Sequence, residues 1–163
     1  MKQKHINAYM ECAEAFAKCS NAERLQVGTV IVKNNRIISC GYNAQPEHID
    51  ESCEEKIYSR GAGAWMDEDE FLAQFPFKDD IGYYGLKTSD TVRHSEKSAL
   101  MGLVKSSESA TGATLFCTHG CCKFCSIDIV DAGIKTVYYK HDYRSAEGLD
   151  YLKQNGVDVI KLC

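Results

Sequence analysis

Hydrophobic residues at the start of the chain follow first a helical and then a strand-like pattern. Helical spacing near the N-terminus predicts an amphipathic helix over residues 5–19. A β-branched apolar run at 27–32 and a second apolar stretch at 37–43 flank the polar segment 33–36. Two asparagines in that segment, Asn34 and Asn35, tolerate positive φ, so we expect a tight turn between antiparallel strands.

From residue 94 onward, helical and strand patterns alternate. They predict helices at 95–105, 122–132 and 146–154, and strands at 114–118, 136–139 and 157–160. Strands that alternate with helices favour a mostly parallel sheet covered by helices, here with an antiparallel hairpin at its start. The expected fold is therefore α/β, a three-layer α/β/α sandwich with a mixed five-stranded sheet. The length of 163 residues fits one domain over 1–163.

Residues 44–93 follow neither pattern. Acidic clusters at 47–55 and 67–70 lie among Pro46 and glycines, and only a helix near 67–74 is expected. A segment of this length without regular structure is usually a functional loop, a lid or a partner contact. We therefore expect an irregular acidic insertion at about 44–93.

Charge and cysteine content narrow the functional classes. Residues 47–90 hold twelve acidic and four basic side chains, whereas the rest of the chain holds eleven acidic and fifteen basic. No nucleic-acid polymer is expected as a partner, but a small anionic ligand fits the mildly basic remainder.

The sequence has no apolar run long enough to span a membrane. Nine cysteines, an odd number, favour metal ligands and buried thiols over a disulfide framework, and predict a reducing, cytoplasmic setting.

Two short motifs carry candidate chemistry. His94 and Glu96 form an H-x-E motif, and Cys122 and Cys125 form a C-x-x-C motif, each before a predicted helix. Helix N-termini favour thiolates, and a neutral imidazole can add a third ligand. Three such ligands leave one tetrahedral position of Zn²⁺ open, as in catalytic zinc sites, and Glu96 could then move the proton of a water molecule. A C-x-x-C motif alone also occurs in redox motifs and structural zinc sites.

Together these motifs resemble the zinc nucleobase deaminases. Over residues 5–43 and 91–162 the chain is similar to the cytidine/deoxycytidylate deaminase superfamily, and most similar to the phage-type deoxycytidylate (dCMP) deaminases. The resemblance implies the cytidine deaminase-like fold, a catalytic Zn²⁺ and hydrolysis of dCMP to dUMP and ammonia, which would supply dUMP for thymidylate synthesis. It also implies a homo-oligomer, with a hexamer favoured, in the host cytoplasm if a phage encodes the chain.

Several substrate contacts follow from the same resemblance. Asn43, in the segment Gly41-Tyr42-Asn43, is expected to reach the sugar and base, and Tyr143 the nucleotide phosphate. Arg144 could add a charge-assisted contact. Independently of the resemblance, Arg24 precedes the predicted strand at 27–32 and could also reach a phosphate, with a solvated arginine as the alternative.

Other positions suggest the shape of the pocket. Gly28 could let the substrate approach the backbone closely. Thr29 and Ser95 stand where the family has alanine, and both are expected at the pocket. These differences leave open another base, such as a 5-substituted cytosine or an adenine nucleotide, or a free nucleoside. A non-catalytic zinc-stabilised binding protein is a third alternative, against which the intact Glu96 argues.

Two further cofactors follow from the family alone. Phage-type enzymes carry a second, structural zinc near the insertion, for which Cys19, His48 and Cys53 are candidate ligands without an evident fourth. Ala44 stands where the family has glycine, so an Mg²⁺-bound nucleoside triphosphate effector is left open.

Overall fold

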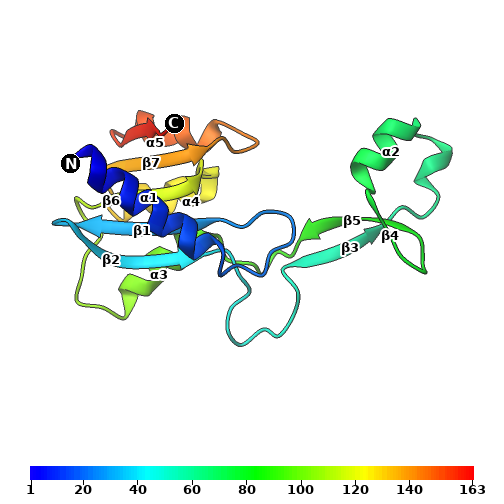
Figure 1. Cartoon of the computed structure of the whole chain (residues 1–163), viewed down its shortest axis with the longest axis horizontal. Helices are drawn as coiled ribbons and strands as arrows, with labels where there is room; N and C mark the ends of the chain where they lie inside the picture. Colours follow the sequence, from blue (N-terminus) through cyan, green and yellow to red (C-terminus); the bar gives the residue numbers. More distant parts are fainter.

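The protein consists of a larger layered body and a smaller sheet that projects from it (Figure 1). The computed structural model describes residues 1–163 apart from the side chain of Ala62. The helices are α1 (Gln3–Ala17), α2 (Glu68–Gln74), α3 (Ser95–Val104), α4 (Lys123–Asp131) and α5 (Glu147–Gln154), with a 3-10 turn at Ala62–Ala64. The strands are β1 (Gly28–Lys33), β2 (Arg36–Tyr42), β3 (Glu54–Tyr58), β4 (Phe77–Lys78), β5 (Tyr83–Thr88), β6 (Thr114–His119), β7 (Thr136–His141) and β8 (Asp158–Lys161).

The body is built on a mixed five-stranded sheet with the order β2-β1-β6-β7-β8. β1 runs antiparallel to β2 and β6, whereas β6, β7 and β8 are parallel. The turn between β1 and β2 places Asn34 at φ 51° and Asn35 at φ 59°, the left-handed conformation expected from the sequence. Both the hairpin and the mixed sheet are confirmed.

Helices cover both faces of this sheet. On one face α1 packs Ile6, Met10 and Ala13 against alternate sheet residues, Val30, Val32 and Phe116. On the other face α3, α4 and α5 bury Ala99, Leu103, Ile129, Leu149 and Leu152 against Ile31, Leu115 and Val137. Successive strand residues point to opposite faces, and each fully buried Leu, Ile or Val contributes roughly 1.5–3 kcal/mol. The predicted three-layer α/β/α fold is confirmed.

The prediction of an irregular segment at 44–93 is wrong for much of its length. β3, β5 and β4 form an antiparallel three-stranded sheet in that order. The strands of this sheet lack long apolar runs, and the sheet is held instead by aromatic pairs and polar bonds. The ring centre of Tyr84 lies 5.7 Å from that of Tyr58 and 5.5 Å from that of Phe77, and Nζ of Lys56 lies 2.8 Å from Oδ2 of Asp79. The predicted helix at 67–74 is present as α2.

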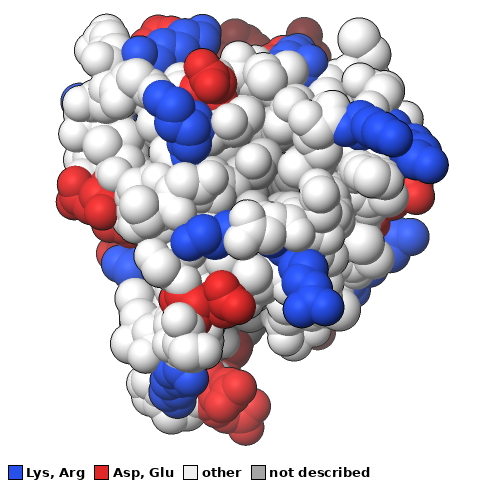
Figure 2. All heavy atoms as spheres, turned by 90° about the vertical axis from the view of Figure 1, so that its left-hand side faces the viewer, with Lys and Arg blue, Asp and Glu red and all other residues white. Residues whose placement is uncertain are grey.

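Two features bear on possible partners. No helix in the described part of the chain is long and apolar enough to cross a membrane. Figure 2 shows the end of the body opposite the projecting sheet, where Lys and Arg side chains are separated by acidic and uncharged atoms.

Candidate functional site

The two sequence motifs meet at the N-termini of two helices. His94 is the N-cap residue of α3, and Cys122 is the N-cap residue of α4. Nδ1 of His94 lies 3.4 Å from Sγ of Cys122 and 3.4 Å from Sγ of Cys125. Among the described residues, this is the one group of three or more His, Cys, Asp or Glu side chains whose ligand atoms all lie within 4.8 Å of one another. One imidazole and two thiols at this spacing fit a zinc site with one open position.

Hydrogen bonds among these three side chains change their pKa values. The hydrogen bond from the Cys125 thiol lowers the pKa of Cys122 to about 4, and the same bond raises the pKa of Cys125. The hydrogen bond to Cys122 raises the pKa of His94. A divalent cation bound here would displace these protons, because zinc ligands bind as thiolates and neutral imidazole.

Glu96 lies beside this cluster with its side chain buried. It is 4% exposed, and burial is the main reason why its pKa is raised. The Ser95 hydroxyl donates to Oε2 of Glu96 at 3.0 Å, and Ser95 Oγ lies 2.8 Å from Thr29 Oγ1. A carboxyl group with a raised pKa is suited to accept and return a proton near neutral pH. Ser95 and Thr29 therefore hold Glu96 in one orientation.

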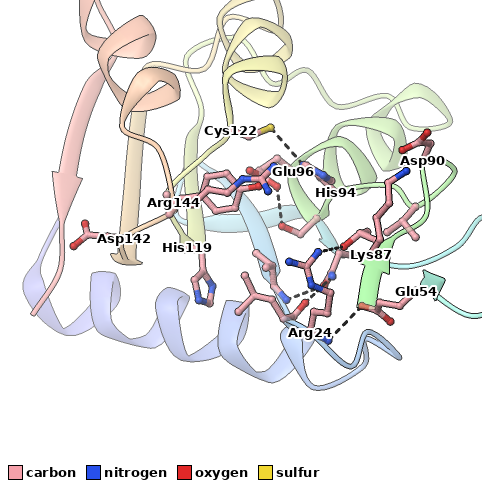
Figure 3. Close-up of a pocket in the computed structure, with 18 residues that line it drawn as sticks. Arg24, Glu54, Lys87, Asp90, His94, Glu96, His119, Cys122, Asp142 and Arg144 are labelled. Carbon is pink, nitrogen blue, oxygen red and sulfur yellow. Dashed lines mark hydrogen bonds between the residues drawn. The ribbon is translucent and has the colours of Figure 1, made fainter. Parts of the chain in front are cut away.

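A cavity of about 600 Å³ opens above Glu96 and the cluster. Eight of the predicted site residues line it: Arg24, Asn43, His94, Ser95, Glu96, Cys122, Tyr143 and Arg144. Figure 3 shows Arg24 and Arg144 at the same cavity as His94 and Glu96, reaching it from different elements. The guanidinium of Arg144 lies 5.3 Å from the centre of the Tyr143 ring. The cavity thus combines a candidate metal site, a buried carboxyl group and two arginines.

Asn43 lines the cavity while its side chain bonds the neighbouring loop. Its Oδ1 accepts the N–H of Val27 at 2.8 Å, and its Nδ2 donates to the carbonyl of Leu25 at 2.8 Å. Each group can form one more hydrogen bond. The structure therefore gives Asn43 a positioning role, and the substrate contact stays a prediction.

Two predicted pocket residues lie behind the cavity instead of lining it. A Cβ on Gly28 would lie 2.0 Å from the carbonyl oxygen of Ala13 and 2.4 Å from the amide nitrogen of Ala17. Close packing of α1, and not an approaching substrate, therefore accounts for glycine at this position. Thr29 is fully buried and acts on the site only through Ser95 and Cys117, whose Sγ lies 3.3 Å from Thr29 Oγ1.

The candidate second zinc site is not assembled. Cys19 is exposed just after α1, whereas Cys53 is buried at the start of the projecting sheet. These two and His48 do not form a metal-ligand group within the part of the chain that the structure describes.

Several cavity residues were missed from the sequence. The projecting sheet and the segment after it supply Glu54, Lys87, Thr88 and Asp90, and the end of β6 supplies His119. Burial lowers the pKa of His119. The position of His119 directly after the predicted strand 114–118 could have placed it at the same end of the sheet as the C-x-x-C motif. No sequence pattern indicated that Glu54, Lys87, Thr88 and Asp90 lie at the cavity, because the register between β3 and β5 is not evident from their composition.

The chain is similar in sequence to a family of known proteins. Residues 3–141 match the family described as "Cytidine and deoxycytidylate deaminase zinc-binding region". Deoxycytidylate deaminase of Saccharomyces cerevisiae is 31% identical over 152 residues, which cover 93% of this chain but only 42% of the yeast protein. Deoxycytidylate deaminase of Mycobacterium phage D29 is 31% identical over 131 residues, which cover 80% of this chain and 90% of the phage protein.

A solved structure matches the whole chain. The crystal structure of dCMP deaminase from cyanophage S-TIM5, in complex with dCMP and dUMP, has a TM-score of 0.78 and 36% sequence identity. The match covers 99% of each chain and therefore extends over the projecting sheet as well as the body.

Proposed function

Because this chain belongs to the cytidine and deoxycytidylate deaminase family, we propose that it is a zinc-dependent enzyme that converts dCMP and water to dUMP and ammonia. One observation carries the proposal: the buried carboxyl group of Glu96 lies beside the cluster of His94, Cys122 and Cys125 at the base of a cavity. A purely structural metal would not need an acid–base group facing the same space.

In this proposal each residue of the cluster has a defined task. His94, Cys122 and Cys125 would hold Zn²⁺, which supplies Lewis acidity that lowers the pKa of water. Glu96 accepts a proton from the attacking water and passes it to N3 of cytosine while a C4–O bond forms. Glu96 then takes the proton of the new hydroxyl group on C4 and passes it to the 4-amino group, so that the C4–N bond breaks, ammonia leaves and C4 becomes a carbonyl. Ser95 keeps the carboxyl group oriented by donating to Oε2.

Substrate binding would use the rest of the cavity. Asn43 retains hydrogen-bonding capacity for the sugar and base, and Tyr143 can donate its hydroxyl to the 5′-phosphate. Arg144 and Arg24 line the same cavity and can donate to phosphate oxygens through two N–H groups at once. The S-TIM5 enzyme, which was crystallised with dCMP and dUMP, supports a nucleotide of this size.

Ammonia release from a nucleotide panel tests the proposal. We expect dCMP to react with a higher kcat/KM than deoxycytidine, 5-methyl-dCMP or dAMP. Preference for one of the others would assign a different base or a free nucleoside. Full zinc content without ammonia release from any of them would instead indicate a binding protein.

We also propose that the chain works as a single deaminase domain with an insertion, in a cytoplasmic homo-oligomer, with a hexamer favoured. Trp65 is 91% exposed and Ile81 77% exposed in the projecting part, where an apolar contact between copies would cover them. Nine free thiols fit a reducing compartment. Regulation by an Mg²⁺-bound nucleoside triphosphate stays a prediction for a binding assay.

A further inference from the structure

We propose that the projecting sheet sets the affinity of the cavity for nucleotides through Glu54 and Thr88, two positioning residues for Arg24. This inference rests on the proposed function, because it takes the 5′-phosphate of the substrate as the anion that Arg24 binds. It gives a role to the part of the chain that lies outside the layered body.

Glu54 and Thr88 are direct neighbours across two strands. Glu54 on β3 pairs with Thr88 on β5, so both side chains point to the same face of the sheet. Both residues line the cavity, and Glu54 is 7% exposed. One cross-strand pair at the end of the projecting sheet therefore reaches the substrate cavity of the body.

These two side chains hold Arg24 at both of its ends. The carboxyl oxygens of Glu54 accept the backbone N–H groups of Glu23 at 3.2 Å and Arg24 at 3.3 Å. Thr88 Oγ1 accepts a hydrogen bond from Nη1 of Arg24 at 3.1 Å. Figure 3 draws the bond between Arg24 and Glu54 as a dashed line. The backbone and the guanidinium of Arg24 are thus both fixed by the projecting sheet.

Arg24 is still able to bind an anion. A guanidinium has five N–H donors, and the contact with Thr88 uses one of them. Within the described residues, the Arg24 guanidinium is not paired with a carboxylate within 4.0 Å. Glu54 bonds the backbone and leaves the charge of the guanidinium free for the substrate.

Fixing this side chain before the substrate arrives should tighten binding. A free arginine loses rotamer freedom when it binds a ligand, and a side chain held in advance avoids most of that loss. The effect belongs to phosphate binding and not to the reaction at C4, because the side chain of Thr88 bonds Arg24 and forms no hydrogen bond to Glu96, His94, Cys122 or Cys125 in the described structure. A solely structural role for Thr88 would not distinguish a nucleotide from a nucleoside.

The central test compares dCMP with deoxycytidine in Thr88→Val, which keeps the side-chain shape but removes the acceptor. We expect KM for dCMP to rise about 3- to 10-fold, as for the loss of one hydrogen bond, with kcat for dCMP nearly unchanged. The ratio of kcat/KM for dCMP to that for deoxycytidine should fall by the same factor. Thr88→Ser, which keeps the hydroxyl, should restore the ratio.

A double-mutant cycle asks whether Thr88 acts through Arg24. Arg24→Ala should lower the same ratio by about 10- to 150-fold, the range for a hydrogen bond to a charged group. Adding Thr88→Val to Arg24→Ala should change the ratio no further. Glu54→Gln, which disturbs one of the two backbone bonds, should lower the ratio, whereas the exposed Glu70→Gln on α2 serves as the matched control and should not.

Several results would overturn the inference. Equal losses for dCMP and deoxycytidine in Thr88→Val would make its role structural, and a further loss in the Arg24→Ala background would mean that it acts elsewhere. Thr88→Val and Thr88→Ser decide the question even if Glu54→Gln fails to fold. Wild-type protein that releases no ammonia from dCMP would instead overturn the proposed function, and this inference with it.

Discussion

Replacing Glu96 with Gln tests the chemistry of the site with little change in its shape. Glutamine fills the same buried space, and its amide oxygen can accept the Ser95 hydroxyl now bonded to Oε2 at 3.0 Å. The cluster of His94, Cys122 and Cys125 does not include residue 96 and should still bind zinc. Only the ability to take up and return a proton is lost.

The structure sets the size of the expected effect. Because Glu96 is 4% exposed, bulk water cannot easily replace it as a proton carrier. General acid–base catalysis is typically worth 10²- to 10⁴-fold, so kcat should fall at least about 10²-fold, or about 2.7 kcal/mol.

Stability should move in the opposite direction. Burial raises the pKa of Glu96, so the folded state holds the ionised carboxyl group less favourably than the unfolded chain does. This penalty is present above the raised pKa and disappears as the pH falls through it. Glutamine carries no such penalty, so after zinc has been removed from both proteins with a chelator, Glu96→Gln should unfold at a temperature no lower than the parent at pH 7.

Three measurements on the same preparation complete the test: ammonia release from dCMP, zinc content by elemental analysis and the unfolding temperature. Glu108→Gln, on the exposed loop after α3, is the matched control and should keep parent activity. Zinc retained with activity close to the parent level would show that another residue moves the proton. Zinc lost together with activity would mean that the substitution had disturbed the metal site.

Three other predictions concern metal, substrate and assembly. Cys122→Ala and Cys125→Ala should each lose the bound zinc, and a chelator should abolish activity until Zn²⁺ is restored; full zinc in both variants would refute the ligand assignment. Tyr143→Phe should lower kcat/KM for dCMP relative to deoxycytidine by roughly 10- to 150-fold, and an equal effect on both would place the phosphate site elsewhere. Light scattering should give a mass above the 18.2 kDa of one chain, and 18.2 kDa at working concentration would exclude the oligomer.

The layered body could be predicted because its sequence patterns agree with its packing. The helix predicted at 122–132 is observed as Lys123–Asp131, and the strand predicted at 136–139 as Thr136–His141. Burial on one side gives α1 and α5 a clear helical period, and glycine at φ 76° ends α4 at Gly133 as capping requires. The grouping of His94, Cys122 and Cys125 could be predicted in the same way, since the H-x-E and C-x-x-C motifs each precede a helix at one edge of the sheet.

The projecting sheet could not be predicted in this way. β3 reads Glu54-Glu55-Lys56-Ile57-Tyr58, in which neither face is consistently apolar. Its stability comes from cross-strand aromatic contacts and an ion pair, and these depend on a register that only the folded chain reveals. The partners of Arg24 were missed for the same reason, because Glu54 and Thr88 are 34 positions apart and meet only through that register.

The loop at 23–27 connects these two parts of the site, because it is held from both sides. Glu54 bonds its backbone from the projecting sheet, and Asn43 bonds Leu25 and Val27 from the body. Loss of activity in Asn43→Ala could therefore arise from a lost sugar contact or from a displaced Arg24. The two causes differ in substrate dependence, since dCMP and deoxycytidine share the sugar but only dCMP has the phosphate. The loss of a sugar contact should lower activity on both substrates equally, whereas a displaced loop should lower activity on dCMP more than on deoxycytidine.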